Sequence, residues 1–179
     1  MKASEVLQAS IDDIETGKWI CGDLHIKDYE GKSPNPKEMG CAVGLVSLNS
    51  GDTKTIKITE RDLPWMPNHT PESVDQLSVG REKGSSSGAS ATISKEGIKV
   101  GDHYEVARYP KQSSPQETKD AIKYLDETVP EDYRYPSYNS GLKGKIDNVV
   151  NFNDSYCVGP KDAKKWFEAA RDRAIADGN

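Results

Sequence analysis

The clearest alternation of apolar and polar positions lies near the two ends of the chain. Near the start, four apolar residues recur at helical spacing: Val6, Leu7, Ile11 and Ile14. Gly17 follows them, at a position where a left-handed residue commonly ends a helix. Near the other end, Gly159-Pro160 precedes a second helical pattern: Ala163, Trp166, Phe167, Ala170 and Ala174. These patterns predict two amphipathic helices, one from about residue 4 and one from about residue 160.

Local signals predict three more helices between them. Asn35-Pro36-Lys37-Glu38 combines an N-cap residue, a proline at the first helical position and a carboxylate at the third, which predicts a helix from there to Gly51. Ser114-Pro115-Gln116-Glu117 repeats this chemistry and predicts a helix that ends before Pro130. The apolar residues between Ile146 and Phe152 predict a short helix.

The first of these three helices carries a stripe of small residues. Gly40, Gly44 and Ser47 lie next to the face that holds Cys41 and the leucines at 45 and 48. A stripe without large side chains lets another backbone approach unusually closely. In this helix, Cys41 would lie in the second turn.

Residues 52–112 have a different character. Residues 53–59 read as a strand, residues 98–100 and 104–107 as a strand pair around Gly101-Asp102, and residues 80–92 as a flexible loop. A further β-type segment is centred on Leu24-His25-Ile26. We therefore expect one α+β domain over residues 1–179, helix-rich from both chain ends, with 52–112 as a β-containing, insertion-like segment.

Composition and charge narrow the classes of partner. The formal net charge of −5 argues against a nucleic-acid partner, because such binding depends on clustered lysine and arginine. The sequence has no apolar run of 18 residues and no signal-peptide pattern at its start, so we expect a soluble cytoplasmic protein with no membrane contact. Three widely spaced cysteines predict reduced thiols and no disulfide framework.

Three short motifs carry a resemblance. Trp19-x-Cys21-Gly22, Cys41-Ala42-x-Gly44 and Phe152-Asn153-Asp154 resemble a family of small helical proteins of unknown function that is common in actinobacteria and their phages. The resemblance covers roughly residues 3–50 and 114–176. It implies a compact helical protein, often phage-borne, and it implies no activity. The segment 52–112 departs from the family's usual pattern.

One hypothesis for chemistry is a thiol nucleophile at Cys41. His25 would act as the general base, and Asp154 or Asn153 would orient the histidine, because cysteine catalysis needs a thiolate, a proton acceptor and a third polar group. The alternative is a buried structural cysteine. In the same way, Asn153 and Asp154 could cap a helix or hold a loop by hydrogen bonds.

A second hypothesis is a ligand-binding surface in the segment that follows the helix predicted to end before Pro130. Its candidate residues are Tyr133, Arg134, Tyr135, Tyr138, Lys143 and Lys145, with Lys143 in a flexible loop at 141–144. Aromatic rings can stack on a base or a partner's side chain, while arginine and lysine bind phosphate or carboxylate. The alternative is that the tyrosines pack their rings on the helices and leave their hydroxyl groups in water.

Other common types of site are not indicated. The three histidines (25, 69 and 103) are not paired at metal-ligand spacing, so we expect neither a metal nor a cofactor, and no nucleotide-hydrolysing, dinucleotide, metalloprotease or serine-hydrolase motif occurs. We expect a small binding protein, phage-encoded on the strength of the resemblance, that engages a host protein or a small anionic, nucleotide-like ligand and counters host defence. The alternative is a cysteine-dependent hydrolase or transferase that uses Cys41, His25 and Asp154. The sequence does not set the oligomeric state.

Overall fold

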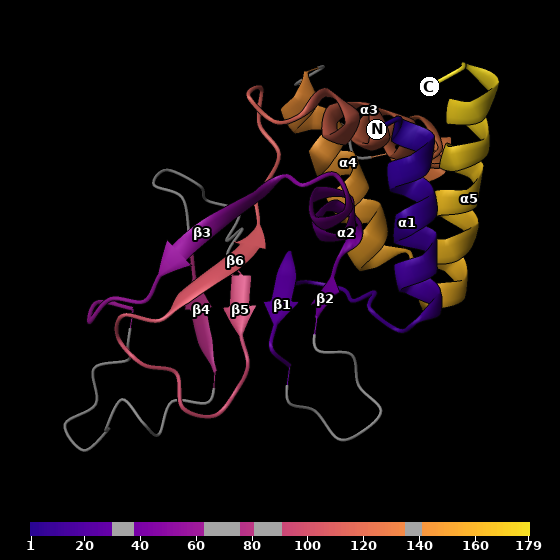
Figure 1. Ribbon diagram of the computed structural model, residues 1–179. Helices are drawn as coiled ribbons and strands as arrows, with labels where there is room; N and C mark the ends of the chain where they lie inside the picture. Colours follow the sequence, from indigo (N-terminus) through magenta and orange to yellow (C-terminus); the bar gives the residue numbers. More distant parts are fainter. Residues whose placement is uncertain (30–37, 63–75, 81–90, 135–140) are drawn as a thin grey trace.

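The computed structural model describes residues 1–29, 38–62, 76–80, 91–134 and 141–179. The helices are α1 (Ala3–Glu15), α2 (Ala42–Asn49), α3 (Gln116–Glu127), the short 3-10 helix η2 (Glu131–Tyr133), α4 (Leu142–Ser155) and α5 (Pro160–Ala176). They gather in one layer, and the strands extend from it on the side of α2 (Figure 1). None of the helices in the described ranges has the length and hydropathy that a membrane span requires.

The first and last helices form an antiparallel pair at one edge of the helical layer (Figure 1). Polar contacts link them along their whole length: Lys2 to Gly178, Ala3 to Asn179, Gln8 to Arg171 and Glu15 to Lys164. The apolar stripes predicted for both helices are buried. The chain therefore closes on itself, with its two described ends side by side.

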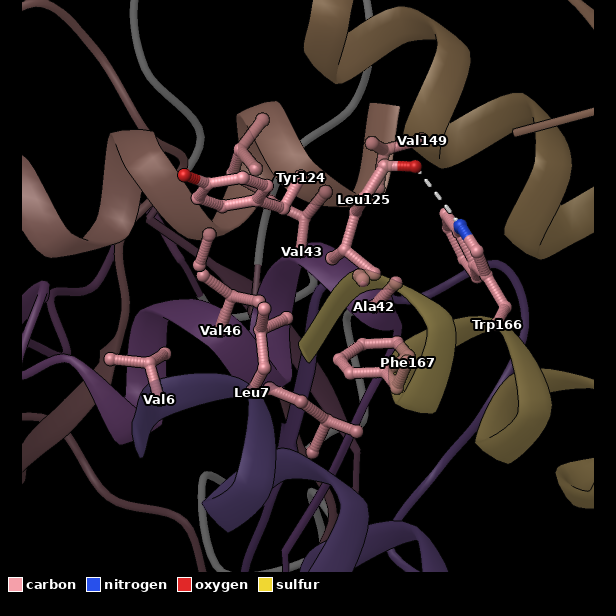
Figure 2. Packing of buried hydrophobic residues seen from close by; sticks show 14 of the residues in the cluster. Val6, Leu7, Ala42, Val43, Val46, Tyr124, Leu125, Val149, Trp166 and Phe167 are labelled. Carbon is pink, nitrogen blue, oxygen red and sulfur yellow. Dashed lines mark hydrogen bonds between the residues drawn. The ribbon is translucent and has the colours of Figure 1, made fainter. Parts of the chain in front are cut away.

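Helix α2 lies at the centre of the main core. Figure 2 shows side chains from every long helix meeting around it: Val6 and Leu7 of α1, Tyr124 and Leu125 of α3, Val149 of α4, and Trp166 and Phe167 of α5. The indole Nε1 of Trp166 donates a hydrogen bond to the backbone oxygen of Leu125 over 3.0 Å. A buried indole keeps its polar group satisfied in this way.

The strands form two small sheets. They are β1 (His25–Lys27), β2 (Met39–Gly40), β3 (Thr53–Lys57), β4 (Leu77–Val79), β5 (Ala91–Ile93) and β6 (His103–Ala107). One sheet has the order β2-β1-β5-β4, with β1 parallel to β5 and the other pairs antiparallel, and β3 pairs with β6 in the second sheet. In the first sheet His25 is opposite both Gly40 and Ala91.

The segment 52–112 has a hydrophobic cluster of its own. The cluster contains Ile58, Leu77, Val79, Ala91, Ile93, Ile98, Tyr104 and Val106. The parallel pairing of β5 with β1 nevertheless joins this segment to the N-terminal part of the chain. The α+β fold expected from the sequence is thus confirmed, with helices from both chain ends and β structure between them.

Another backbone lies unusually close to Gly44. A Cβ atom added there would overlap the backbone oxygen of Leu24, and one added at Gly40 would lie 3.0 Å from the same oxygen. The close backbone approach predicted for this stripe is confirmed at both glycines, although Gly40 belongs to β2 and not to the helix. It brings α2 against the residues that lead into β1.

Four local predictions are wrong. Helix α2 begins at Ala42, because residues 39–40 pair with β1 as strand β2; Asn35–Lys37 lie outside the described residues. Strand β6 pairs with β3 and not with residues 98–100. Ala91 and Thr92, placed in a flexible loop, belong to β5, and residues 81–90 are not described. Residues 142–144 form the first turn of α4 rather than a loop.

Candidate functional site

The three motifs of the resemblance meet at one place, which we call the motif junction: Trp19, Ile20, Gly22, Ala42, Asn153 and Asp154. At its centre is Asn153, which is fully buried on α4. Its Oδ1 accepts hydrogen bonds from the backbone N–H of Ala42 over 3.0 Å and from Nε1 of Trp19 over 2.8 Å. Since Ala42 is the first residue of α2, Asn153 caps that helix from a distant segment.

The second half of the motif junction holds the loop at Cys21. Nδ2 of Asn153 donates to the backbone oxygen of Ile20 over 3.3 Å and to Oδ1 of Asp154 over 2.7 Å. The same Oδ1 accepts from the backbone N–H of Gly22 over 3.0 Å. All the polar atoms of Asn153 are therefore occupied by protein groups, which is the structural alternative considered for this residue.

Cys41 lies next to the motif junction, as the N-cap residue of α2. The prediction that it lies in the second turn is wrong, because the helix begins later than the capping pattern indicated. Burial raises the pKa of the Cys41 thiol to about 12, although the first-turn amides of Val43 and Gly44 act in the opposite direction. The rise in pKa caused by desolvation is larger than the fall caused by the amides at the start of α2. At neutral pH the group is therefore a thiol and not a thiolate.

His25 is fully buried between the two sheets. Its Nδ1 accepts a hydrogen bond from the backbone N–H of Ala107 over 3.1 Å, and its Nε2 lies 3.7 Å from Oε1 of Glu38. Nε2 has no hydrogen-bond partner among the described residues. Burial lowers the pKa of His25 to about 4, with Glu38 opposing the shift. The acceptor nitrogen of the neutral imidazole is thus already occupied by a backbone N–H group.

The three candidate catalytic residues do not form a connected triad. The hydrogen bonds found for His25 and Asp154 lead to Ala107 and to the motif junction, and no hydrogen bond within the described residues joins either of them to Cys41. A base that is already accepting a backbone proton cannot take one from a thiol without breaking that bond. Nor do three His, Cys, Asp or Glu side chains of the described chain gather closely enough to hold a metal ion.

The candidate ligand surface is only partly visible. Tyr135 and Tyr138 lie outside the described residues. Tyr133 is 41% exposed, and its ring contacts that of Tyr156 in a tilted arrangement, with centroids 4.4 Å apart. It also contacts Phe152 at 5.8 Å, and Phe152 meets Trp166 edge-on at 4.8 Å.

We call Tyr133, Phe152 and Tyr156 the aromatic cluster. Phe152 and Tyr156 were not among the residues predicted for this surface. Their spacing of four residues, which places both on one face of a helix, was the available signal. Tyr156 is 43% exposed and Val158, two residues later, is 94% exposed. The cluster therefore extends the hydrophobic core to the surface.

Two of the three basic residues predicted for an anionic ligand, Arg134 and Lys143, have partners within the protein. Nη2 of Arg134 donates to the backbone oxygen of Asp126 over 2.6 Å, and the guanidinium also lies 3.5 Å from the carboxylates of Asp126 and Glu131. Lys143 forms an ion pair of 3.0 Å with Asp147 one turn further along α4. Lys145 lies on the same first turn of α4.

A small pocket of about 220 Å³ lies between α1, α2 and β2. Its lining residues are Asp13, Lys18, Glu38, Met39, Leu45, Leu48 and Asn49. Asp13 binds Lys18 over 2.7 Å and Asn49 over 2.9 Å, and Glu38 binds Lys27 over 2.9 Å. The charged groups around the pocket thus already have partners in the protein.

In comparisons with known proteins, no family model, no curated protein and no solved structure matched this chain.

Proposed function

We propose that this chain is a binding protein that contacts a protein partner through the aromatic cluster. The observation that carries the proposal is that the rings of Tyr133 and Tyr156 lie in tilted contact, with centroids 4.4 Å apart, while about two-fifths of each residue is exposed. Tyrosines supply large contact area with few rotatable bonds, and they are enriched among the residues that dominate binding energy. Two exposed tyrosine rings in contact with each other are suited to that role.

The cluster is anchored firmly enough to act as a preformed surface. Phe152 contacts the rings of both tyrosines and packs edge-on against Trp166, whose indole donates a hydrogen bond to Leu125 of α3. A surface whose side chains are already ordered loses less conformational entropy on binding. This supports recognition by a rigid patch.

A small anionic ligand has less support than a protein. Arg134 and Lys143 each contact a carboxylate, so an anion would have to compete with an existing ion pair. The pocket near α1 is smaller than the roughly 300–1,000 Å³ typical of ligand sites. The cysteine-dependent enzyme also lacks support, since the Cys41 thiol is protonated at neutral pH.

The resemblance described from the sequence supports the rest of the proposal. It favours a phage-encoded protein whose partner belongs to the host cell, where binding would counter host defence. We propose that the partner is a single host protein and that the aromatic cluster is its contact surface.

Site-specific photo-crosslinking in the cells that naturally make the protein tests this proposal. p-Benzoyl-phenylalanine would replace Tyr156 in one variant and Ile175, an exposed apolar residue of α5, in a matched control. We expect one discrete cross-linked species from position 156 and none from position 175. Introducing Tyr133→Ala into the position-156 variant should remove the cross-linked species. Identical cross-linking patterns at both positions would refute the proposal.

A further inference from the structure

We propose that the aromatic cluster recognises a basic segment of its protein partner, in which an arginine or lysine lies against the tyrosine rings. The inference rests on the proposed function and adds the chemistry of the partner. It follows from the charges around the rings, from the way these charges are held, and from the apolar residue beside them.

Carboxylates outnumber cations in the segments that carry the exposed residues of the cluster. Residues 131–134 and 154–162 contain four acidic side chains, Glu131, Asp132, Asp154 and Asp162, and two basic ones, Arg134 and Lys161. All four acidic residues are exposed, and the Glu131 side chain is 93% exposed. Charge complementarity at an interface favours a partner of the opposite sign and speeds its association.

Several of these charges are held in place by the fold. Oδ1 of Asp154 accepts from the backbone N–H of Gly22 over 3.0 Å, and Oδ2 of Asp162 accepts from the backbone N–H of Val158 over 3.0 Å. Hydrogen bonds to the backbone thus hold both carboxylates, one of which precedes Tyr156 in the sequence while the other follows it. Arg134, by contrast, points its guanidinium at Asp126 and Glu131, so its charge is largely balanced within the protein.

The aromatic rings and the carboxylates favour the same class of side chain. A guanidinium or ammonium group is attracted to the face of a tyrosine ring, and it also pairs with carboxylates. Arginine is especially suited because its planar group can stack on a ring while its N–H groups bind an acid. Val158, 94% exposed, offers an apolar contact for an aliphatic stem or a neighbouring residue of the partner.

Peptide binding provides the test. The probe is a fluorescein-labelled peptide of alternating arginine and leucine, eight residues long, compared with an acidic peptide (glutamate for arginine) and a neutral one (serine for arginine). Fluorescence anisotropy is measured with the full chain and with three double variants. These are Tyr133→Ala/Tyr156→Ala, Glu131→Gln/Asp132→Asn, and the control Glu60→Gln/Asp172→Asn, which removes two exposed charges elsewhere. Circular dichroism and the urea midpoint check that each variant is folded.

We expect the basic peptide to bind, and the tyrosine pair to weaken binding about tenfold or more, as is typical for residues that dominate an interface. The Glu131/Asp132 pair should weaken binding several-fold, with a smaller loss at high salt, and the control pair less than twofold. Equal weakening by the control would show general attraction to an acidic protein and would overturn the inference.

Other outcomes separate this inference from the proposed function. Binding of the neutral or acidic peptide that depends on the tyrosines would refute the charge preference and leave the contact surface in place. Failure of the basic peptide to bind at any accessible concentration would also refute the inference, while the photo-crosslinking result would still decide the proposed function.

Discussion

Replacing Asn153 by alanine tests whether the motif junction holds the fold together. The amide side chain is fully buried, and its Oδ1 accepts from the backbone N–H of Ala42 and from the indole of Trp19. Its Nδ2 donates to Ile20 and Asp154. The substitution removes all of these bonds at once and leaves two N–H donors without an acceptor.

The expected loss of stability follows from those two donors. A buried donor that loses its acceptor costs about 1–3 kcal/mol, so the loss at two donors should lower the free energy of unfolding of Asn153→Ala by about 2–6 kcal/mol. For a domain of this size that corresponds to a fall in Tm of roughly 4–24 °C. It is a large fraction of the roughly 5–15 kcal/mol by which a typical domain is stable.

Urea denaturation followed by circular dichroism measures the effect. Asn151→Ala is the matched control, because Asn151 lies two residues away on α4 and is partly exposed. The control should change stability by less than about 0.5 kcal/mol, as is usual for surface positions. If Asn153→Ala matched the control, the argument that buried hydrogen bonds at this junction stabilise the fold would be refuted.

Asn153→Asp provides a second check on the same geometry. An aspartate keeps both acceptor interactions and its negative charge suits the N-terminus of α2, but it places a second carboxylate beside Asp154, where Nδ2 now lies 2.7 Å from Oδ1. Protonation of one carboxyl group would restore a donor. The loss in free energy of unfolding of Asn153→Asp relative to the wild type should therefore be smaller near pH 4 than at pH 7. A loss that grew on acidification would contradict this account.

Three further predictions concern single residues. Gly44→Ala should prevent folding or lower the free energy of unfolding by several kcal/mol. The clash with the neighbouring backbone outweighs the roughly 1 kcal/mol that alanine gains over glycine in a helix. The yield of folded protein on expression and the thermal midpoint measure this loss of stability. His25 has its pKa lowered to about 4 by burial, so the unfolded chain takes up a proton first as pH falls below about 6.5. The stability of the wild type relative to His25→Asn, measured by urea denaturation, should therefore drop by roughly 3 kcal/mol between pH 7 and 4. With Ellman's reagent at neutral pH, the exposed Cys21 should react faster than the buried Cys41. Modification of Cys41 as fast as that of Cys21 would support the enzyme hypothesis.

The helices near the ends were predictable because their sequences alternate between a buried and an exposed face. α1 and α5 bury the residues that their helical spacing indicated, and Gly17 takes the positive φ of 84° expected after a helix. In a helix with one apolar stripe, the spacing of the apolar residues indicates both the helical period and the face that is buried. These elements also led to the correct fold class.

Helix α2 was harder to delimit because it is buried on nearly all sides. Its residues Ala42–Ser47 are all buried, so no polar face marks where it begins. The capping pattern at 35–38 is a purely local signal, whereas the actual start is set by a distant residue, Asn153 on α4. A cap that comes from another segment cannot be seen in a sequence window.

The sheets were the least predictable part, since most of their pairings are long-range and their strands are short. β4 and β5 have three residues each, and β5 lies parallel to β1, from which it is separated by more than sixty residues. Strands of this length carry little periodic signal, and their partners depend on tertiary packing. The candidate site shows the same limit, because the ring that contacts Tyr133 belongs to Tyr156, which lies just after α4 in a later part of the sequence.

The pairing of α1 with α5 has a consequence for how the protein is made. The ribosome produces α1 first and its packing partner last, so the apolar stripe of the nascent chain stays uncovered until residues 160–176 have emerged, for roughly ten seconds or more at usual synthesis rates. Chaperones that bind apolar segments would meet this helix during that interval. A fragment that stops before α5 would retain the same uncovered surface and would aggregate rather than reach the native state.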